Sequence, residues 1–442
     1  MILTKDNFGK PMEFREDFLQ AVWKYQYFDK NSLLTTDGQS LEIKKIGYHN
    51  QYEGPDFLEA HVRIGKIDYH GHVEIHIHSS DWNAHDHSAD TKYAPVILHV
   101  VWTHDKEINN QDGTAIPTLE LRGRIFLDTM RNYERLTSSR EEIICSPHIE
   151  RVPEIVRFSM LEKALVERLE HKSQKLAGIL TATNNDWEET TFRWLLYCFG
   201  FKTNADTMLQ LATKLPFRQL LKLQQQPQAI RAILFGMAGL LPDQPEDEEG
   251  EALQKEFAYQ HKKLKLSPPL HRNDWKFLGV RPPGFPTVRL AQLAELIGKQ
   301  QGFFSTLLNG LDSFGQFQKS MDIQLPEYWR NHYQLGQPSP RIQSAKLGSS
   351  TLHLLAINLL VPLWYEYGKY TQQSEWKEKC FDFLQTLPAE QNHIIRKYTW
   401  IESHQQSAFE SQALIGLFQD YCQPKRCLHC KIGQSLLKPE KK

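Results

Sequence analysis

Residues 68–82 read DYHGHVEIHIHSSDW, and the alternation in this stretch constrains the fold more than any other feature of the chain. Val73, Ile75 and Ile77 occupy odd positions, whereas the even positions from 70 to 78 carry only His or Glu. Successive side chains of a β-strand point to opposite faces of the sheet. The period of two therefore predicts one strand with an apolar face and a titratable face.

Other strand patterns surround this stretch, and a helical pattern precedes them. Residues 13–28 carry apolar side chains at helical spacing. Period-two or apolar runs occur at 41–48, 57–65, 95–104 and 118–123. The run at 96–102, VILHVVW, is apolar almost throughout, as expected for a strand buried on both faces. With a short helix within 85–94, the order becomes helix, three strands, short helix and strand.

Helical patterns dominate the rest of the chain. They occur at 157–180, 190–201, 287–300 and 352–368, with little strand signal between them. The acidic stretch 243–251 is predicted to be a solvated loop, as charge runs usually are. The sequence thus predicts an α/β domain over 1–145 and a mainly α-helical domain over 146–442 that ends in a cysteine-rich tail.

Bulk properties limit the classes of function. The longest apolar runs, at 232–241 and 354–365, are shorter than the roughly 20 residues that cross a bilayer. The N-terminus carries no secretory pattern. We therefore expect a soluble, cytoplasmic protein without membrane contact. The formal net charge is −1, so binding to nucleic acid would need local basic patches.

Two carboxylates are predicted to meet near the histidine strand. The breaker at 54–55 places Asp56 at the start of a strand, and a tight turn at 65–66 returns the chain to Glu74. Oxygen ligands of this kind suit Mg²⁺ or Mn²⁺, which catalyse phosphodiester hydrolysis. His76 lies two residues beyond Glu74 on the same face, where it ligates the metal or orients water.

These residues resemble a known signature. GPD at 54–56 followed by EIH at 74–76 is similar to the PD-(D/E)xK nuclease signature, and the order of elements matches that restriction-endonuclease-like core, a mixed sheet flanked by helices. The resemblance implies that Asp56 and Glu74 are catalytic metal ligands and puts His76 in the position of the lysine. An imidazole can ligate a metal but supplies no fixed positive charge. The implied function is a metal-dependent nuclease acting on DNA or RNA.

Further residues extend this prediction and leave alternatives open. Glu16 or Asp17, in the first helix, would be the additional acid that some members of that superfamily use. The further candidate metal ligands are His78, His85, His87, Asp90 and His99. A purely histidine-rich Zn²⁺ or Fe²⁺ site acting on a small molecule is one alternative. A nuclease-like fold that lost catalysis and only binds nucleic acid or serves as a scaffold is another.

The C-terminal cysteines form a second candidate site. Cys422, Cys427 and Cys430 have C-x4-C-x2-C spacing, which lets the sulfurs of one loop converge on one centre. Cys145 is the favoured fourth ligand, for Zn²⁺ or for a [4Fe–4S] cluster. Weaker candidates for that position are Cys198 and His429.

A basic segment could contact nucleic acid. The segment from His261 to Arg289 contains seven Lys or Arg and one acidic residue, and aromatic residues are interspersed among them. Cations neutralise phosphates and aromatic rings stack on bases. The predicted DNA- or RNA-binding residues are Lys262, Lys263, Lys276, Arg281 and Arg289. Alternatively, the aromatic residues form a core and the cations are its solvated rim.

The whole chain also resembles a bacterial family known only as a domain of unknown function. The matching stretches are GPDFLEAHV, HVEIHIHSSDW, WKFLGVRPPGFPTVRLAQLA and YCQPKRCLHCKIG. This resemblance extends over nearly the full length and implies no activity.

Overall fold

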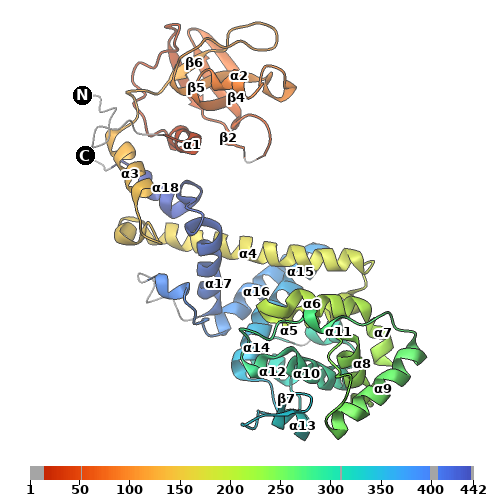
Figure 1. The fold of residues 1–442 in the computed structure, drawn as a ribbon. Coiled ribbons are helices and arrows are strands. Elements are labelled where there is room, and N and C mark those ends of the chain that lie inside the picture. Colours follow the sequence, from red (N-terminus) through yellow and green to blue (C-terminus); the bar gives the residue numbers. More distant parts are fainter. Residues whose placement is uncertain (1–13, 51, 309–310, 399–406, 440–442) are drawn as a thin grey trace. The chain divides into compact units, whose positions relative to one another are not determined.

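The computed structural model describes residues 14–50, 52–308, 311–398 and 407–439 (Figure 1). The chain is a mixed α/β protein with one mixed sheet and many helices. It divides into two compact units. Unit one comprises Met1–Glu162, Lys397–Trp400 and Leu417–Lys442, and unit two comprises Lys163–Arg396 and Ile401–Gly416.

Unit one contains the predicted helix and strands in the predicted order. Its helices and strands are α1 (Glu16–Tyr25), β1 (Leu41–Lys45), β2 (Tyr48–His49), β3 (Phe57–Ile64), β4 (Ile67–His78), α2 (Asp81–Ala84), β5 (Val96–Thr103), β6 (Thr118–Glu120), α3 (Leu127–Ser138) and α18 (Lys431–Leu437). Short 3₁₀ or π segments are η1 (Thr91–Tyr93), η2 (Ser146–Arg151), η8 (Phe418–Cys422) and η9 (Cys427–His429).

The sheet has the strand order β1-β3-β4-β5-β6, and β2 pairs with β3. Strands β1, β3 and β4 are antiparallel, whereas β4, β5 and β6 run parallel. The histidine strand β4 is therefore central. Gly71 allows β5 to approach it, because a Cβ at this position would lie 2.3 Å from the carbonyl oxygen of Pro95.

Both faces of the middle of β4 are buried. Val73 and Ile75 are 0% exposed, as predicted for the apolar face. Glu74 and His76, on the titratable face, are only 5% and 1% exposed. Buried polar groups need partners, so these two side chains must be satisfied within the protein.

Aromatic residues pack around the sheet. The α1 residue Trp23 is fully buried, meets Phe57 edge-on and donates from its indole nitrogen to the carbonyl oxygen of Ile46 at 3.1 Å. Trp82 of α2 anchors a separate apolar cluster with Val96 of β5. Helix α2 is thereby fixed against the sheet, and the loop that follows it lies beside β4.

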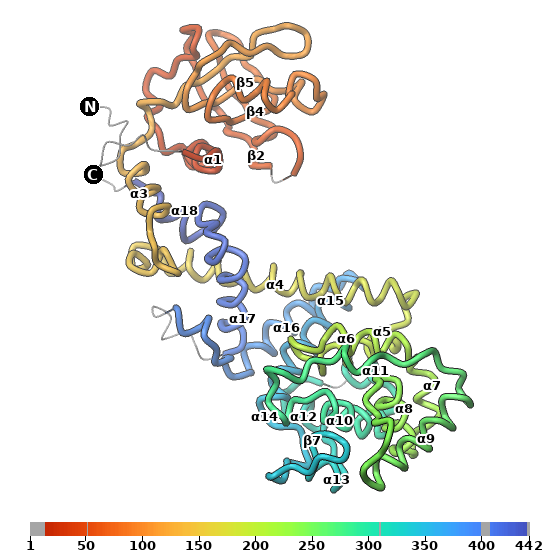
Figure 2. Tube along the Cα trace, viewed as in Figure 1, coloured from red at the N-terminus to blue at the C-terminus, as the bar shows by residue number. Residues whose placement is uncertain are grey.

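The C-terminal segment returns to unit one. Helix α18 lies beside α3 in Figures 1 and 2. The side-chain amide of Asn132 on α3 donates to the carbonyl oxygen of Lys438 at 3.1 Å. The hydroxyl of Tyr25 on α1 donates to Gln434 Oε1 on α18 at 2.6 Å. The tail is thus attached to both helices.

Unit two is mainly helical. Helix α4 (Glu154–Ala182) begins in unit one and continues into unit two, and α17 (Ala408–Leu417) ends in unit one. The other elements are α5 (Trp187–Phe199), α6 (Phe201–Lys214), α7 (Phe217–Leu221), α8 (Pro227–Met237), α9 (Glu248–Leu264), η3 (Arg272–Asp274), η4 (Pro282–Gly284), α10 (Pro286–Lys299), α11 (Phe303–Leu308), α12 (Phe314–Ser320), α13 (Glu327–Asn331), β7 (His332–Gln334), β8 (Gln337–Pro338), α14 (Ser349–Leu355), η5 (Ala356–Leu360), α15 (Val361–Thr371), α16 (Glu375–Thr386) and η6 (Ile395–Lys397). Within the described residues, no helix combines the length and apolar character needed to cross a membrane.

The prediction of a loop over 243–251 is wrong for residues 248–251, which are helical. Helix α9 begins at Glu248, and the Asp247 side chain caps it by accepting from the backbone N–H of Gly250 at 2.8 Å. The acidic residues of its first turn interact favourably with the positive end of the helix dipole. Part of the charge run therefore starts a helix.

Candidate metal centre on the histidine strand

Asp56 and Glu74 meet at one end of the β3–β4 hairpin. The backbone N–H of Asp56 donates to Glu74 Oε2 at 3.0 Å. Asp56 Oδ2 accepts from the backbone N–H of Ile75 at 3.1 Å, and its Oδ1 accepts from Gln20 on α1 at 2.8 Å. A register shift between Phe57 and Ala60 marks a bulge at this point of β3. Both carboxylates are therefore fixed in position.

Burial makes these carboxylates hard to ionise. It raises the pKa of Glu74, because water no longer solvates the charged form. It also raises the pKa of Asp56, and the nearby charge of Glu74 raises it further. Glu16 on α1 has a raised pKa for the same principal reason, although its side chain is 40% exposed. A bound cation would offset this penalty for the whole group.

His76 is at the centre of a chain of imidazoles. Its Nδ1 lies 2.8 Å from His99 Nε2 on β5, and its Nε2 lies 3.2 Å from His85 Nδ1. Burial lowers the pKa of His76 to about 2 and that of His99 to about 3, because the charged imidazolium is not solvated there. Both rings are neutral at physiological pH, and neutral imidazole is the form that binds metals.

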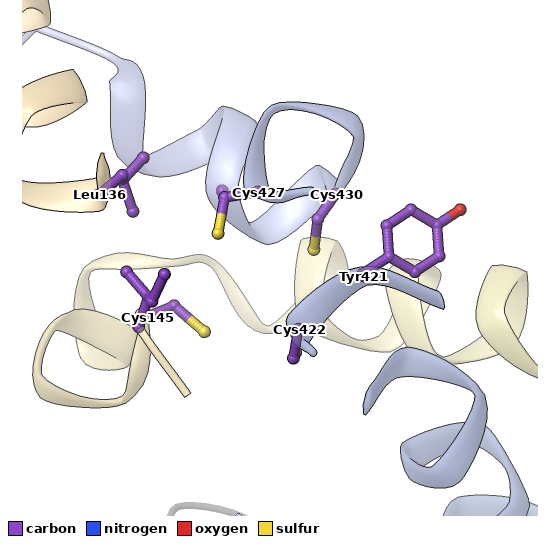
Figure 3. Close-up of a pocket in the computed structure, with 8 residues that line it drawn as sticks. Leu136, Cys145, Tyr421, Cys422, Cys427 and Cys430 are labelled. Atoms are coloured by element: carbon purple, nitrogen blue, oxygen red, sulfur yellow. The ribbon is translucent and has the colours of Figure 1, made fainter. Parts of the chain in front are cut away.

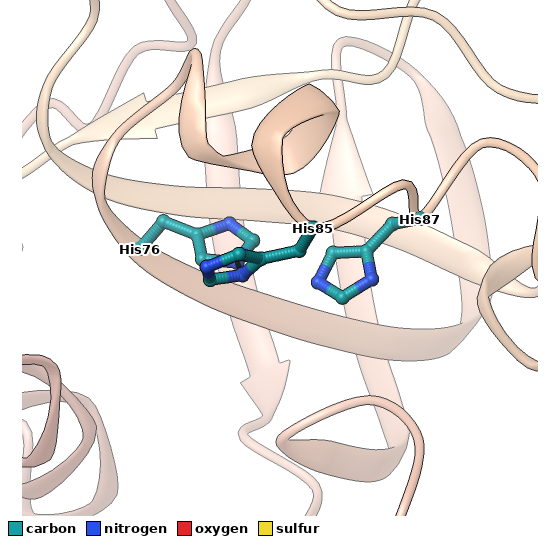
Figure 4. Close-up of side chains that lie close together, drawn as sticks. All are labelled: His76, His85 and His87. Atoms are coloured by element: carbon teal, nitrogen blue, oxygen red, sulfur yellow. Dashed lines mark hydrogen bonds between the residues drawn. The ribbon is translucent and has the colours of Figure 1, made fainter.

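His76, His85 and His87 converge, as Figure 4 shows. Each offers a ligand atom, and these atoms lie within 4.8 Å of one another. His85 and His87 come from the loop after α2, which Trp82 anchors. Glu74 Oε1 lies 3.6 Å from His76 Nε2 and 3.5 Å from His87 Nε2. Three imidazoles and one carboxylate thus share one location.

This donor set fits a transition metal. Ligands held at 2.0–2.1 Å around a tetrahedral ion lie about 3.4 Å apart, close to the separations of 3.2, 3.5 and 3.6 Å within the group. His87 Nε2 is also a buried nitrogen without a hydrogen-bond partner. A metal ion would satisfy it. Imidazole-rich sets suit Zn²⁺ or Fe²⁺ better than Mg²⁺, which prefers oxygen.

Other predicted ligands lie outside this group. His78 is exposed at the end of β4, and its backbone N–H donates to Asp81 Oδ2. The Asp90 side chain caps η1 by accepting from the backbone N–H of Lys92. Glu16 is closer, with its Oε1 3.9 Å from His76 Nε2. Asp17 has a buried Oδ1 without a hydrogen-bond partner.

The cysteines lie in two places. Cys145, Cys422, Cys427 and Cys430 line one cavity in unit one (Figure 3). Cys198, a weaker candidate for the fourth ligand, is buried in α5 of unit two, where its thiol donates to the carbonyl oxygen of Asn358. All six cysteines are thiols rather than disulfides.

The predicted nucleic-acid-binding cations differ in exposure. Lys262, Lys263, Lys276 and Arg281 are exposed. Arg289 is half-buried: its guanidinium lies 4.6 Å from the centre of the Phe201 ring and donates to Gln292. Burial lowers the pKa of Arg289 to about 10. Trp275 is 5% exposed and donates to the carbonyl oxygen of Ala238, so its ring is core.

The sheet and the cluster on its central strand define an α/β protein with a candidate metal centre. The chain belongs to the family described as "Protein of unknown function (DUF2851)", whose model matches residues 16–393. The match includes the carboxylates, the imidazoles and Cys145 but ends before the other three cysteines of the cavity. No curated protein and no solved structure matches the chain. The resemblance to PD-(D/E)xK nucleases stays a prediction.

Proposed function

We propose that this protein is a metal-dependent hydrolase that cleaves phosphodiester bonds of DNA or RNA. The observation that carries the proposal is the convergence of His76, His85 and His87 beside Glu74. The order of helix, three antiparallel strands, helix and parallel strand agrees with the nuclease-like core implied by the sequence. The meeting of Asp56 with Glu74 supports the proximity that the PD-(D/E)xK signature implies for these two residues.

The residues have distinct roles in this proposal. His76, His85, His87 and Glu74 would hold the metal, which when bound lowers the pKa of water and neutralises phosphate charge. His99 holds the His76 ring in place through the 2.8 Å contact. Asp56 is occupied by Gln20 and Ile75, so it positions Glu74 and the hairpin.

Glu16 is the candidate general base. Its carboxylate is 40% exposed, and its Oε1 lies 3.9 Å from His76 Nε2. Burial raises its pKa, which brings its proton affinity closer to that of an effective base near neutral pH. His85 is also exposed, so substrate has access to this side of the cluster. Glu16 would accept the proton of the attacking water.

Cleavage by the purified full chain tests the proposal. Labelled single-stranded DNA, duplex DNA and RNA are incubated with Mg²⁺, Mn²⁺ or Zn²⁺. We expect cleavage by the parent, loss of it in Glu74→Gln and His76→Ala, and parental activity in His70→Ala, an exposed histidine of the same strand. Equal cleavage by parent and Glu74→Gln would overturn the assignment, as would a parent that cleaves none of these substrates.

The imidazole content favours a second candidate, a Zn²⁺ or Fe²⁺ enzyme for a small molecule. It predicts stoichiometric metal that is lost in His76→Ala, together with no cleavage of nucleic acid. A chain that neither binds metal nor cleaves nucleic acid would instead match the scaffold alternative.

A further inference from the structure

Four cysteines from separate parts of unit one surround a single cavity. Cys145 precedes η2, Cys422 ends η8, and Cys427 and Cys430 flank the turn of η9. Figure 3 shows the sulfur atoms of Cys427 and Cys430 directed toward the side on which Cys145 and Cys422 lie. Nearly 300 residues of sequence separate Cys145 from the other three. Only the folded chain brings these thiols together.

The backbone around the cavity is closely fitted. A Cβ at Gly433 would lie 2.1 Å from the carbonyl oxygen of Cys427, so only glycine allows α18 to start this close to the η9 turn. The other lining residues are apolar or aromatic: Leu136, Ile144 and Tyr421. The hydroxyl of Tyr398 donates to the sulfur of Cys422 at 3.3 Å. A hydrogen bond to sulfur is a common way of tuning thiolate ligands.

The spacing of the sulfurs is too wide for one zinc ion. Four thiolates at 2.3 Å from a tetrahedral Zn²⁺ would lie about 3.8 Å apart. Among the residues that the structure describes, the histidine trio is the group whose ligand atoms lie within 4.8 Å of one another, and the cysteines form no such group. A polyatomic centre fits this arrangement better than a single ion.

We propose that Cys145, Cys422, Cys427 and Cys430 ligate a [4Fe–4S] cluster. Iron and sulfide atoms of such a cluster separate the thiolates more than one ion does. On binding, each of the four thiols releases its proton to solvent and forms one Fe–S bond, and no electron transfer is required. The cluster would connect the segment after α3 with the C-terminal segment, and so hold α18 against α3 and α1.

The test is iron, sulfide and zinc analysis, with visible absorption and Mössbauer spectra, of the full chain purified anaerobically. We expect about four iron and four sulfide per chain, either as purified or after anaerobic incubation with ferrous iron and sulfide. Cys145→Ser and Cys427→Ser should each lose the intact cluster. Cys198→Ala, a buried thiol of unit two, should retain it.

The results that would contradict the proposal can be told apart from one another. One zinc per chain without sulfide, or a chain that takes up no iron on reconstitution, would overturn the proposal. Unchanged iron content in soluble Cys145→Ser would overturn its role as the fourth ligand. Circular dichroism of the serine variants shows whether they are folded. If a variant has lost iron because it is unfolded, the metal content of the parent decides whether the chain holds a [4Fe–4S] cluster.

Discussion

His99 Nε2 lies 2.8 Å from His76 Nδ1, and both rings are buried. A neutral imidazole has one donor nitrogen and one acceptor nitrogen. If His76 donates from Nδ1, its Nε2 lone pair faces His85 and Glu74, as a metal ligand requires. In that tautomer, His99 Nε2 accepts from His76 and fixes the orientation of its ring.

Removing the acceptor on His99 should weaken metal binding. In His99→Phe, His76 loses the partner that orients it, and we expect affinity for Zn²⁺ to fall about 10–100-fold. His99→Gln keeps an acceptor and should retain more of the affinity. Competition titration with a zinc chelator measures both variants. Equal affinities in the parent and in His99→Phe would show that the contact does not orient a ligand.

The buried carboxylates should make the metal-free chain less stable as pH rises. The pKa of Asp56 and that of Glu74 are raised in the folded state. A group with a raised pKa contributes stability fully below its unfolded pKa, about 4, and loses that contribution as pH rises through the folded value. Between these values the folded state binds more protons, so the free energy of unfolding decreases with pH.

Thermal unfolding of chelator-treated protein between about pH 5 and pH 8 measures this slope. We expect Glu74→Gln to flatten it, because the amide does not titrate. Glu59→Gln, on the same hairpin, is the matched control and should keep the parental slope. A parent whose melting temperature rises over this range would contradict the raised values. Added Zn²⁺ should stabilise the parent most at the alkaline end.

Much of unit one follows from local sequence pattern. The alternation around Val73, Glu74 and Ile75 predicts β4, and the apolar run at 96–102 predicts a buried neighbour; both are confirmed. Pattern alone does not predict that Glu74 and His76 are buried, because α1 and the loop after α2 cover that face only in the folded chain. The charge run favours a loop at the start of α9, although Asp247 followed by acidic residues at 248, 249 and 251 is also a helix-start signal.

Only part of the candidate metal centre can be predicted from the sequence. The number of residues in the hairpin predicts that Asp56 and Glu74 meet, and the structure brings them together. Sequence spacing does not distinguish His85 and His87 from His78 as candidate metal ligands. Their convergence depends on Trp82 anchoring α2, which is a tertiary packing effect. The cavity around Cys145 likewise depends on long-range folding that spacing cannot specify.

Lys172 in unit two should give the opposite pH dependence. Its amine donates to Asn358 Oδ1 at 2.9 Å and Gln412 Oε1 at 3.0 Å, and burial, followed by the charge of Arg168, lowers its pKa to about 7. Between this value and the unfolded value of about 10.4, the unfolded state binds more protons, so stability rises with pH.

Urea unfolding across this range measures the effect. Lys172→Met should remove a slope that approaches about 1.4 kcal/mol per pH unit. Lys175→Met, on the same helix, is the control and should leave that slope in place, because the Lys175 pKa is raised rather than lowered. Identical slopes in the parent and in Lys172→Met would show that Lys172 titrates as in the unfolded chain.

Two glycine substitutions should have opposite effects on stability. Gly433→Ala places a Cβ 2.1 Å from the carbonyl oxygen of Cys427, and relieving such a clash costs about 1–3 kcal/mol. Gly178, within α4, has no neighbouring atom within 4 Å of an added Cβ. Gly178→Ala should therefore stabilise the chain by about 0.5–1 kcal/mol, because alanine lowers the entropy of the unfolded state. Equilibrium denaturation measures the free energy of unfolding of both variants, and a Gly433→Ala chain as stable as the parent would contradict the close packing at Gly433.

The hydrogen bond between Tyr25 and Gln434 should couple α1 to the C-terminal helix. Its 2.6 Å length and partly buried position give an expected coupling of about 0.5–1.5 kcal/mol. A double-mutant cycle with Tyr25→Phe and Gln434→Met, followed by urea denaturation, measures it. Tyr27→Phe removes the hydroxyl of a neighbouring stacked ring and should show no coupling to Gln434. Additive effects of the Tyr25 and Gln434 substitutions would mean that α18 does not support α1, the helix that carries Glu16 and Gln20 to the candidate metal centre.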